Sequence, residues 1–78
     1  MKRIKKILSK VLEIEENSIT EKTSPDNVAT WDSFNSLMLV SELENSFNVK
    51  FTTQEVVSIR SVKNIKDILK KNGVILEE

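Results

Sequence analysis

The sequence predicts a small all-α fold: a four-helix bundle with three main helices, one short helix and a long first loop. Apolar residues recur at intervals of three and four in the segments 2–13, 33–47 and 61–71, a spacing that gives each helix one apolar face. No segment alternates apolar and polar residues as a half-buried strand does. The 78 residues are enough for one domain, so we expect a single domain over residues 1–78.

The first helix is expected from about Lys2 to Glu13. Its apolar stripe consists of Ile4, Ile7, Leu8, Val11 and Leu12. Its charges oppose the helix dipole, because Lys2 lies at the positive end and Glu13 at the negative end. Packing against the rest of the chain must therefore hold this helix. Its basic side is interpreted as the solvated face of a bundle helix, and stable membrane association is not expected.

A long loop is expected over residues 17–31. The apolar spacing loses its period there, and Asn, Ser, Thr, Asp and the only proline, Pro25, accumulate. A loop of this length in a small domain is usually functional. The expected anchors of the loop in the core are Ile14, Ile19, Val28 and Trp31. For Trp31, contact with a partner protein is the alternative.

The most apolar helix is expected to begin at Ser33. Asp32 is a natural N-cap, since its carboxylate can accept a hydrogen bond from a free amide of the first turn. The Ser33 hydroxyl is then left free. An anion esterified to it would lie among unpaired N–H groups at the positive end of the helix dipole, which suits a phosphodiester. The Asp-Ser pair alone is more simply explained as a helix cap.

On a helical wheel of this second helix, the apolar residues fill a broad arc that is expected to face the core. The arc contains Leu37, Leu39, Val40, Leu43 and Phe47. Ser36 falls inside the same arc, where neighbouring side chains would hinder its hydroxyl. Met38, Glu42 and Asn45 fall on the opposite, solvent-facing side. An exposed methionine near Ser33 is a plausible contact for a partner.

Two further helices follow. Thr52 and Glu55 form a capping-box pattern, which predicts a short helix to about Ser58. Ser61 is expected to cap the last helix, and Gly73 to end it. The buried stripe of this last helix consists of Val62, Ile65, Ile68 and Leu69.

Composition argues against an enzyme. The chain has no Cys and no His, which removes thiol nucleophiles, imidazole bases and the usual transition-metal ligands. We therefore expect no catalytic residues and no metal site. Because the sequence has no disulfide framework and no apolar run near the length of a signal segment or a membrane span, a cytoplasmic location is expected.

Charge is segregated along the chain. Residues 1–10 hold five bases and no acid, residues 11–59 hold nine acids and two bases, and residues 60–78 hold five bases and three acids. The acidic middle suggests basic partner proteins. A nucleic-acid partner is not expected, because such proteins usually combine a basic stripe with stacking aromatic residues.

The stretch from Trp31 to Leu69 resembles the acyl carrier protein family. In that family the modified serine lies in an Asp-Ser-Leu motif that opens the second helix, followed by an aliphatic run, a Leu-Glu pair and an aromatic residue. The corresponding residues here are Asp32-Ser33-Phe34, then Leu37, Leu39 and Val40, then Leu43-Glu44, then Phe47. The pattern continues through Val49, Phe51, Ile59 and residues 61–65. Phe34 replaces the usual Leu and is also bulky and apolar.

The resemblance implies a carrier that holds acyl intermediates as thioesters on 4′-phosphopantetheine, transferred from coenzyme A to Ser33 by a separate Mg-dependent transferase. The thiol belongs to the cofactor, so a cysteine-free chain can serve thioester chemistry. The expected partner contacts are Asp32, Phe34, Met38, Glu42 and Asn45. The expected partners are a phosphopantetheinyl transferase, an acyl-loading ligase or acyltransferase and downstream acyl-processing enzymes, and the carrier is expected to be a monomer.

The second helix departs from the members that serve fatty-acid synthesis, where it is rich in Glu and Asp. Between Asp32 and Phe47 this chain has only Asp32, Glu42 and Glu44, which favours a specialised biosynthetic pathway of lipids or secondary metabolites. A D-alanyl or other aminoacyl carrier is an alternative, although the Gly-Gly usual in peptidyl carrier domains is absent before Ser33. The alternative from a different class is an unmodified helical protein-interaction domain.

Overall fold

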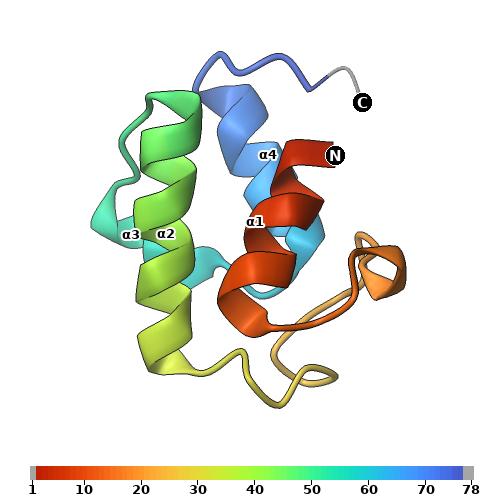
Figure 1. The fold of residues 1–78 in the computed structure, drawn as a ribbon. Helices are drawn as coiled ribbons and strands as arrows, with labels where there is room; N and C mark the ends of the chain where they lie inside the picture. The colour runs from red at the N-terminus through yellow and green to blue at the C-terminus, as the bar shows by residue number, and fades with distance from the viewer. Residues whose placement is uncertain (1, 77–78) are drawn as a thin grey trace.

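The computed structural model describes residues 2–76, which form four α-helices and one 3-10 turn (Figure 1). The helices are α1 (Lys2–Leu12), α2 (Ser33–Phe47), α3 (Thr53–Ser58) and α4 (Val62–Lys71). The 3-10 turn η1 (Glu16–Ser18) lies at the beginning of the long loop. The predicted all-α fold, with three main helices, a short third helix and a long first loop, is confirmed.

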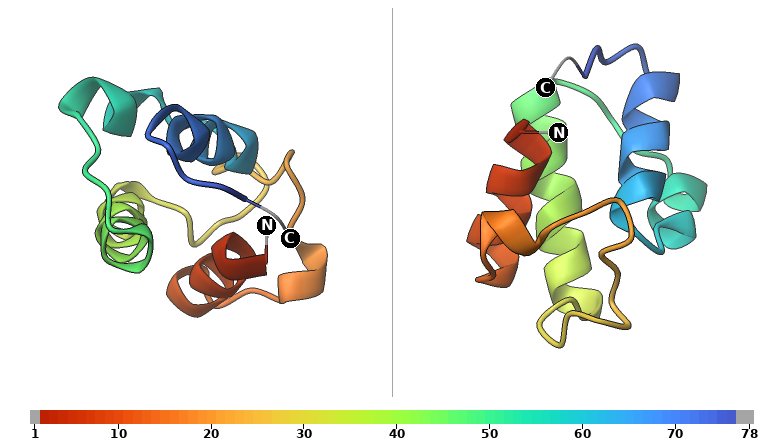
Figure 2. Two further views of the ribbon diagram at one scale, coloured as in Figure 1. Left: turned by 90° about the horizontal axis from the view of Figure 1, so that it is seen from above. Right: turned by 90° about the vertical axis from the view of Figure 1, so that its right-hand side faces the viewer.

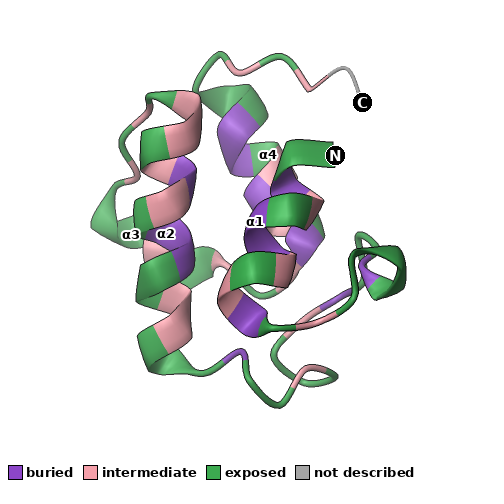
Figure 3. Ribbon diagram, viewed as in Figure 1, coloured by how far each residue is buried: buried purple, intermediate pink, exposed green. Residues whose placement is uncertain are grey.

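The three main helices surround one apolar core. Seen end on, α1, α2 and α4 occupy the corners of a triangle, and α3 lies beside α4 on the path from α2 (Figure 2). Figure 3 shows the buried residues on the sides by which the main helices face one another. The residues that the helices contribute to this cluster are Ile4, Ile7, Leu8, Leu12, Leu39, Leu43, Val62, Ile65 and Leu69. The stripes predicted for α1 and α4 therefore form the core.

The helix starts that the sequence predicted are formed by local hydrogen bonds. The Thr52 hydroxyl accepts from the Glu55 amide at 3.1 Å, and the Glu55 carboxylate accepts from the Thr52 amide at 2.9 Å. The second of these bonds holds the pKa of Glu55 below its usual value. Ser61 caps α4, and Gly73 follows it in the left-handed conformation at a φ of 87°. Both predictions are confirmed.

The first helix ends one residue earlier than predicted. It stops at Leu12, and Glu13 has a left-handed φ of 56°, which is unfavourable for continuing a helix. The Thr30 hydroxyl donates to the free Leu12 carbonyl at 2.7 Å. The end of α1 is therefore fixed by a residue from the far end of the long loop.

The long loop is fastened to the bundle by side chains and by its backbone. Ile19 and Trp31 are buried, and Ile14 and Val28 pack against the core, so the four predicted anchors are confirmed. Thr23 is also buried, and the sequence did not indicate it. Its carbonyl accepts the Val62 amide of α4 at 2.9 Å. The loop thus satisfies a free amide at the start of the last helix.

Candidate functional site

The start of α2 presents a serine at its first position. Asp32 has extended backbone, and its side chain accepts a hydrogen bond from the Asn35 amide at 2.8 Å. Since Asp32 supplies the cap, the Ser33 hydroxyl takes no part in it. Ser33 is exposed. By their position in the helix, the amides of Ser33 and Phe34 have no intrahelical acceptor. The site therefore combines an accessible hydroxyl with N–H groups at the positive end of the helix dipole, which favours an anion.

The nearby Ser36 is in a different environment. It is half-buried, and its hydroxyl oxygen accepts a hydrogen bond from the Trp31 indole N–H at 3.0 Å. This partial burial agrees with the prediction that neighbouring side chains hinder the Ser36 hydroxyl. Of these two serines at the start of α2, Ser33 is the accessible one.

Trp31 is an anchor of the loop. Its side chain is 3% exposed and belongs to the core cluster, so the alternative of a direct partner contact is wrong. The residue two positions before Ser33 is therefore fixed in the core. A residue so placed holds the end of the loop, and with it the start of α2, in one position.

The first two turns of α2 carry an exposed apolar face, which consists of Phe34, Leu37 and Met38. Their exposed fractions are 69%, 61% and 44%. The exposure of Phe34 and Met38 fits the prediction, but the placement of Leu37 in the core is wrong. The start of α2 extends beyond the ends of α1 and α4 (Figures 1 and 2). The buried residues of α2 are Leu39, Val40 and Leu43, so the face that packs on the core is turned away from Leu37, which lies at one edge of the predicted arc.

The acids of α2 are used within the chain. Glu42 accepts from Lys10 of α1 at 3.2 Å, and the Glu44 carboxylate accepts from the Phe51 amide at 2.7 Å. With Asp32 engaged in the cap, each acid of this region already has a contact. Asn45 is exposed, and Glu42 lies half-exposed at the flank next to α1. The carboxylates of Asp32, Glu42 and Glu44 thus already have partners within the chain.

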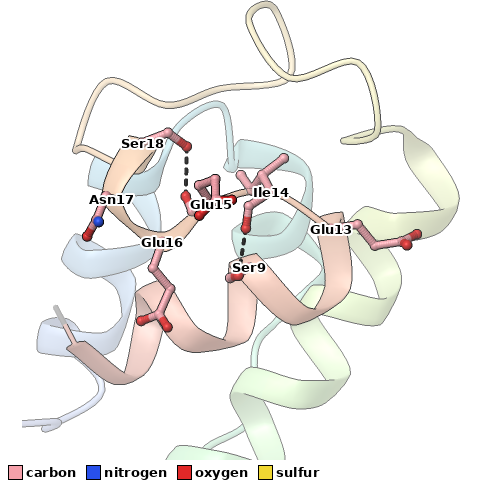
Figure 4. A pocket seen from close by; sticks show the side chains of 7 residues that line it. All are labelled: Ser9, Glu13, Ile14, Glu15, Glu16, Asn17 and Ser18. Atoms are coloured by element: carbon pink, nitrogen blue, oxygen red, sulfur yellow. Dashed lines mark hydrogen bonds between the residues drawn. The ribbon is translucent and has the colours of Figure 1, made fainter.

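One hollow of the described surface does not include Ser33 in its lining. It has a volume of about 850 Å³ and is formed by the end of α1 and by η1 (Figure 4). Its lining residues are Ser9, Glu13, Ile14, Glu15, Glu16, Asn17 and Ser18. Two of its hydroxyls already serve the backbone, since Ser9 donates to the Ile14 carbonyl and Ser18 to the Glu15 carbonyl. Within residues 2–76, no group of three or more acidic side chains is arranged to hold a metal ion.

Within the same residues, no helix is both long and apolar enough to cross a bilayer. The longest, α2, has 15 residues, fewer than the roughly 20 apolar residues that span a membrane.

Comparison with known proteins identifies a family and a relative. Residues 2–69 match the family model described as a phosphopantetheine attachment site. The chain is also 34% identical over 70 residues to the acyl carrier protein of Buchnera aphidicola subsp. Baizongia pistaciae (strain Bp), and the alignment covers 90% of each protein. Both matches include the start of α2.

Proposed function

Because this chain belongs to the acyl carrier protein family, we propose that it carries acyl groups as thioesters on a 4′-phosphopantetheine arm attached to Ser33. Proteins of this family are carriers rather than catalysts, and their cofactor is covalently bound 4′-phosphopantetheine. The observation that supports Ser33 as the attachment site is its exposure at the first position of α2, directly after the Asp32 cap.

The residues present fit this cofactor. A phosphodiester on the Ser33 oxygen would lie next to the free first-turn amides and the positive end of the α2 dipole. Because Ser33 is exposed, an arm attached there would begin at the protein surface. The cofactor supplies the thiol that the chain lacks. The contribution of the chain is to hold the attachment point and to present it.

The attachment reaction requires only a nucleophilic hydroxyl from the chain. The Ser33 oxygen attacks the phosphorus of coenzyme A that bears pantetheine. The new O–P bond forms as the bond to the adenylate half breaks, and adenosine 3′,5′-bisphosphate leaves. The serine proton passes to a base of the transferase, because the chain has no histidine and the Asp32 carboxylate is engaged in the cap.

We also propose that partner enzymes contact the exposed apolar face of Phe34, Leu37 and Met38. Family members work with phosphopantetheinyl transferases and acyl-processing enzymes. All three side chains lie within five residues of Ser33, so an enzyme that reaches Ser33 meets them. Asp32 and Asn45 extend this surface along α2, and Glu42 lies at its edge.

A specialised biosynthetic pathway is the proposed context. Carriers of general fatty-acid synthesis are expected to offer free carboxylates to basic partners. Here Glu42 and Glu44 are engaged with Lys10 and with the Phe51 amide. The cargo is selected by the loading enzyme, an acyl ligase or acyltransferase. The mass of the thioester-bound group, measured on protein isolated from its own cells, tests this proposal against an aminoacyl carrier.

Met38→Glu is expected to fold normally but to slow the partner enzymes by about tenfold, equivalent to roughly 1.4 kcal/mol. Since Met38 is 44% exposed, the free energy of unfolding should change by no more than about 0.5 kcal/mol. In the complex, however, the new carboxylate would lie against apolar groups. Thermal melts and transferase rates measure the two effects, with Met38→Leu as the matched control. Unchanged rates with every partner would remove Met38 from the interface.

The rate of modification is expected to depend only weakly on salt. Three acids of the negative middle segment already face cations: Glu21 faces Lys66 at 2.6 Å, Glu42 faces Lys10 at 3.2 Å and Glu55 faces Lys71 at 3.8 Å. The contact with Lys66 also holds the pKa of Glu21 below its usual value. Charges paired in this way attract a distant partner less strongly.

Transferase rates at low carrier concentration, measured between about 50 and 300 mM salt, test this expectation, because screening lengths fall below roughly 10 Å in this range. We expect a change of less than about twofold. A steep fall with salt would instead support electrostatic steering by the acidic middle segment.

A further inference from the structure

The loop end and the first turn of α2 are joined by side-chain hydrogen bonds. The Thr30 carbonyl accepts both the Asp32 amide at 3.0 Å and the Asn35 side-chain amide at 2.7 Å. One turn into the helix, Ser36 accepts from the indole N–H of Trp31 at 3.0 Å. We refer to Thr30, Trp31, Asn35 and Ser36 as the junction network.

This network brackets Ser33. Thr30 and Trp31 precede Ser33 in the chain, and Asn35 and Ser36 follow it. The side-chain bonds from Asn35 to Thr30 and from Trp31 to Ser36 therefore each connect the loop to the first turns of α2. The network is also attached to rigid parts of the bundle. Trp31 belongs to the core, and the Thr30 hydroxyl donates to the Leu12 carbonyl at the end of α1.

Helix ends fray and loops are mobile unless other contacts hold them. Asn35 and Ser36 are both half-buried, and their side chains are directed to the chain itself. Asn35 and Ser36 thus make contacts within the chain, whereas the exposed apolar face of Phe34, Leu37 and Met38 is available to partners. Their hydrogen bonds limit the movement of the backbone segment that carries the Ser33 hydroxyl.

We propose that Asn35 and Ser36 are positioning residues for the modification of Ser33. The inference rests on the proposed function, because it concerns the reaction at that serine. The attacking oxygen must be held close to the phosphorus and in line with the bond that breaks, and a displacement of about 1 Å can cost a hundredfold in rate. The junction network supplies this alignment from the carrier side.

The test is a steady-state comparison of wild type, Asn35→Ala and Ser36→Ala with a broad-specificity transferase, Mg and coenzyme A. We expect kcat to fall about tenfold in each variant while KM for the carrier changes less than about twofold. Ser36→Thr keeps the acceptor hydroxyl and should recover most of kcat. Ser41→Ala removes an exposed serine from the same helix and should match wild type.

A spectroscopic measurement separates positioning from general destabilisation. Trp31 is the only tryptophan, so one indole N–H signal in the NMR spectrum reports the bond to Ser36. This signal should move in Ser36→Ala and stay close to its wild-type position in Ser36→Thr and Ser41→Ala. Circular dichroism at the assay temperature checks that each variant is folded.

The outcomes are distinct. If wild type is modified and both alanine variants retain its kcat, the inference is overturned while the proposed function stands. A loss that appears only in KM also overturns it, because Asn35 and Ser36 would then act in partner binding. A wild type that an active transferase leaves unmodified overturns the proposed function and this inference with it.

Discussion

Ser33→Ala is expected to gain no phosphopantetheine, whereas wild type and Ser36→Ala each gain one phosphopantetheine mass. The expectation follows from the two environments. Ser33 is exposed at the first position of α2. Ser36 is half-buried, and its hydroxyl accepts a hydrogen bond from the Trp31 indole N–H at 3.0 Å. Without the Ser33 oxygen there is no accessible nucleophile at this helix start, so the loss should be complete.

The experiment incubates each protein with coenzyme A, Mg and a broad-specificity transferase, and measures intact mass. Reactions are followed to completion, because Ser36→Ala is expected to be slower than wild type. Ser33→Ala should remain folded, since exposed substitutions usually change stability by about 0.5 kcal/mol or less. Modification of Ser33→Ala would move the attachment site to another residue. An unmodified wild type, with a transferase active on a known carrier, would favour the unmodified interaction domain.

Trp31→Ala is expected to lower the free energy of unfolding by about 3–5 kcal/mol. The variant removes a side chain that is 3% exposed and the hydrogen bond that it donates to Ser36. Total stability is only about 5–15 kcal/mol for an ordinary domain, and a chain of 78 residues is expected at the lower end. Much of the Trp31→Ala protein should therefore be unfolded at 37 °C.

Urea unfolding followed by circular dichroism measures this loss. Trp31→Phe is the matched control, because it keeps most of the apolar volume and removes the N–H donor. We expect it to cost about 1–2 kcal/mol. If Trp31→Ala kept wild-type stability and only slowed the partner enzymes, the role of Trp31 as a core anchor would be wrong.

The helix start that carries the candidate attachment site was predictable from sequence to a large extent. The N-caps of α2, α3 and α4 were all assigned correctly at Asp32, Thr52 and Ser61. A cap is a contact between residues three apart, so the local sequence contains all of its parts. The position of Ser33 at the start of α2 follows from the same local contacts.

The apolar faces of α1 and α4 were equally predictable, because each short helix packs along its whole length and its spacing alone marks the buried side. The sequence by itself thus determined the helices, their starts and the serine that one of them presents. The tertiary structure decided which side chains near that serine are exposed. Leu37 has core spacing but is exposed, because the core packs against the side of α2 that carries Leu39, Val40 and Leu43. A helical wheel does not show which part of a broad apolar arc the other helices cover.

The pairing of charged side chains could not be predicted from local sequence either. Lys10 and Glu42 lie 32 positions apart, and only the packing of α1 against α2 brings their side chains to 3.2 Å. Thr23 is buried for a similar reason, since its carbonyl meets the start of α4. Local contacts are fixed by spacing in the sequence, whereas the exposure of Leu37, the pairing of Glu42 and the burial of Thr23 depend on segments that only folding brings together.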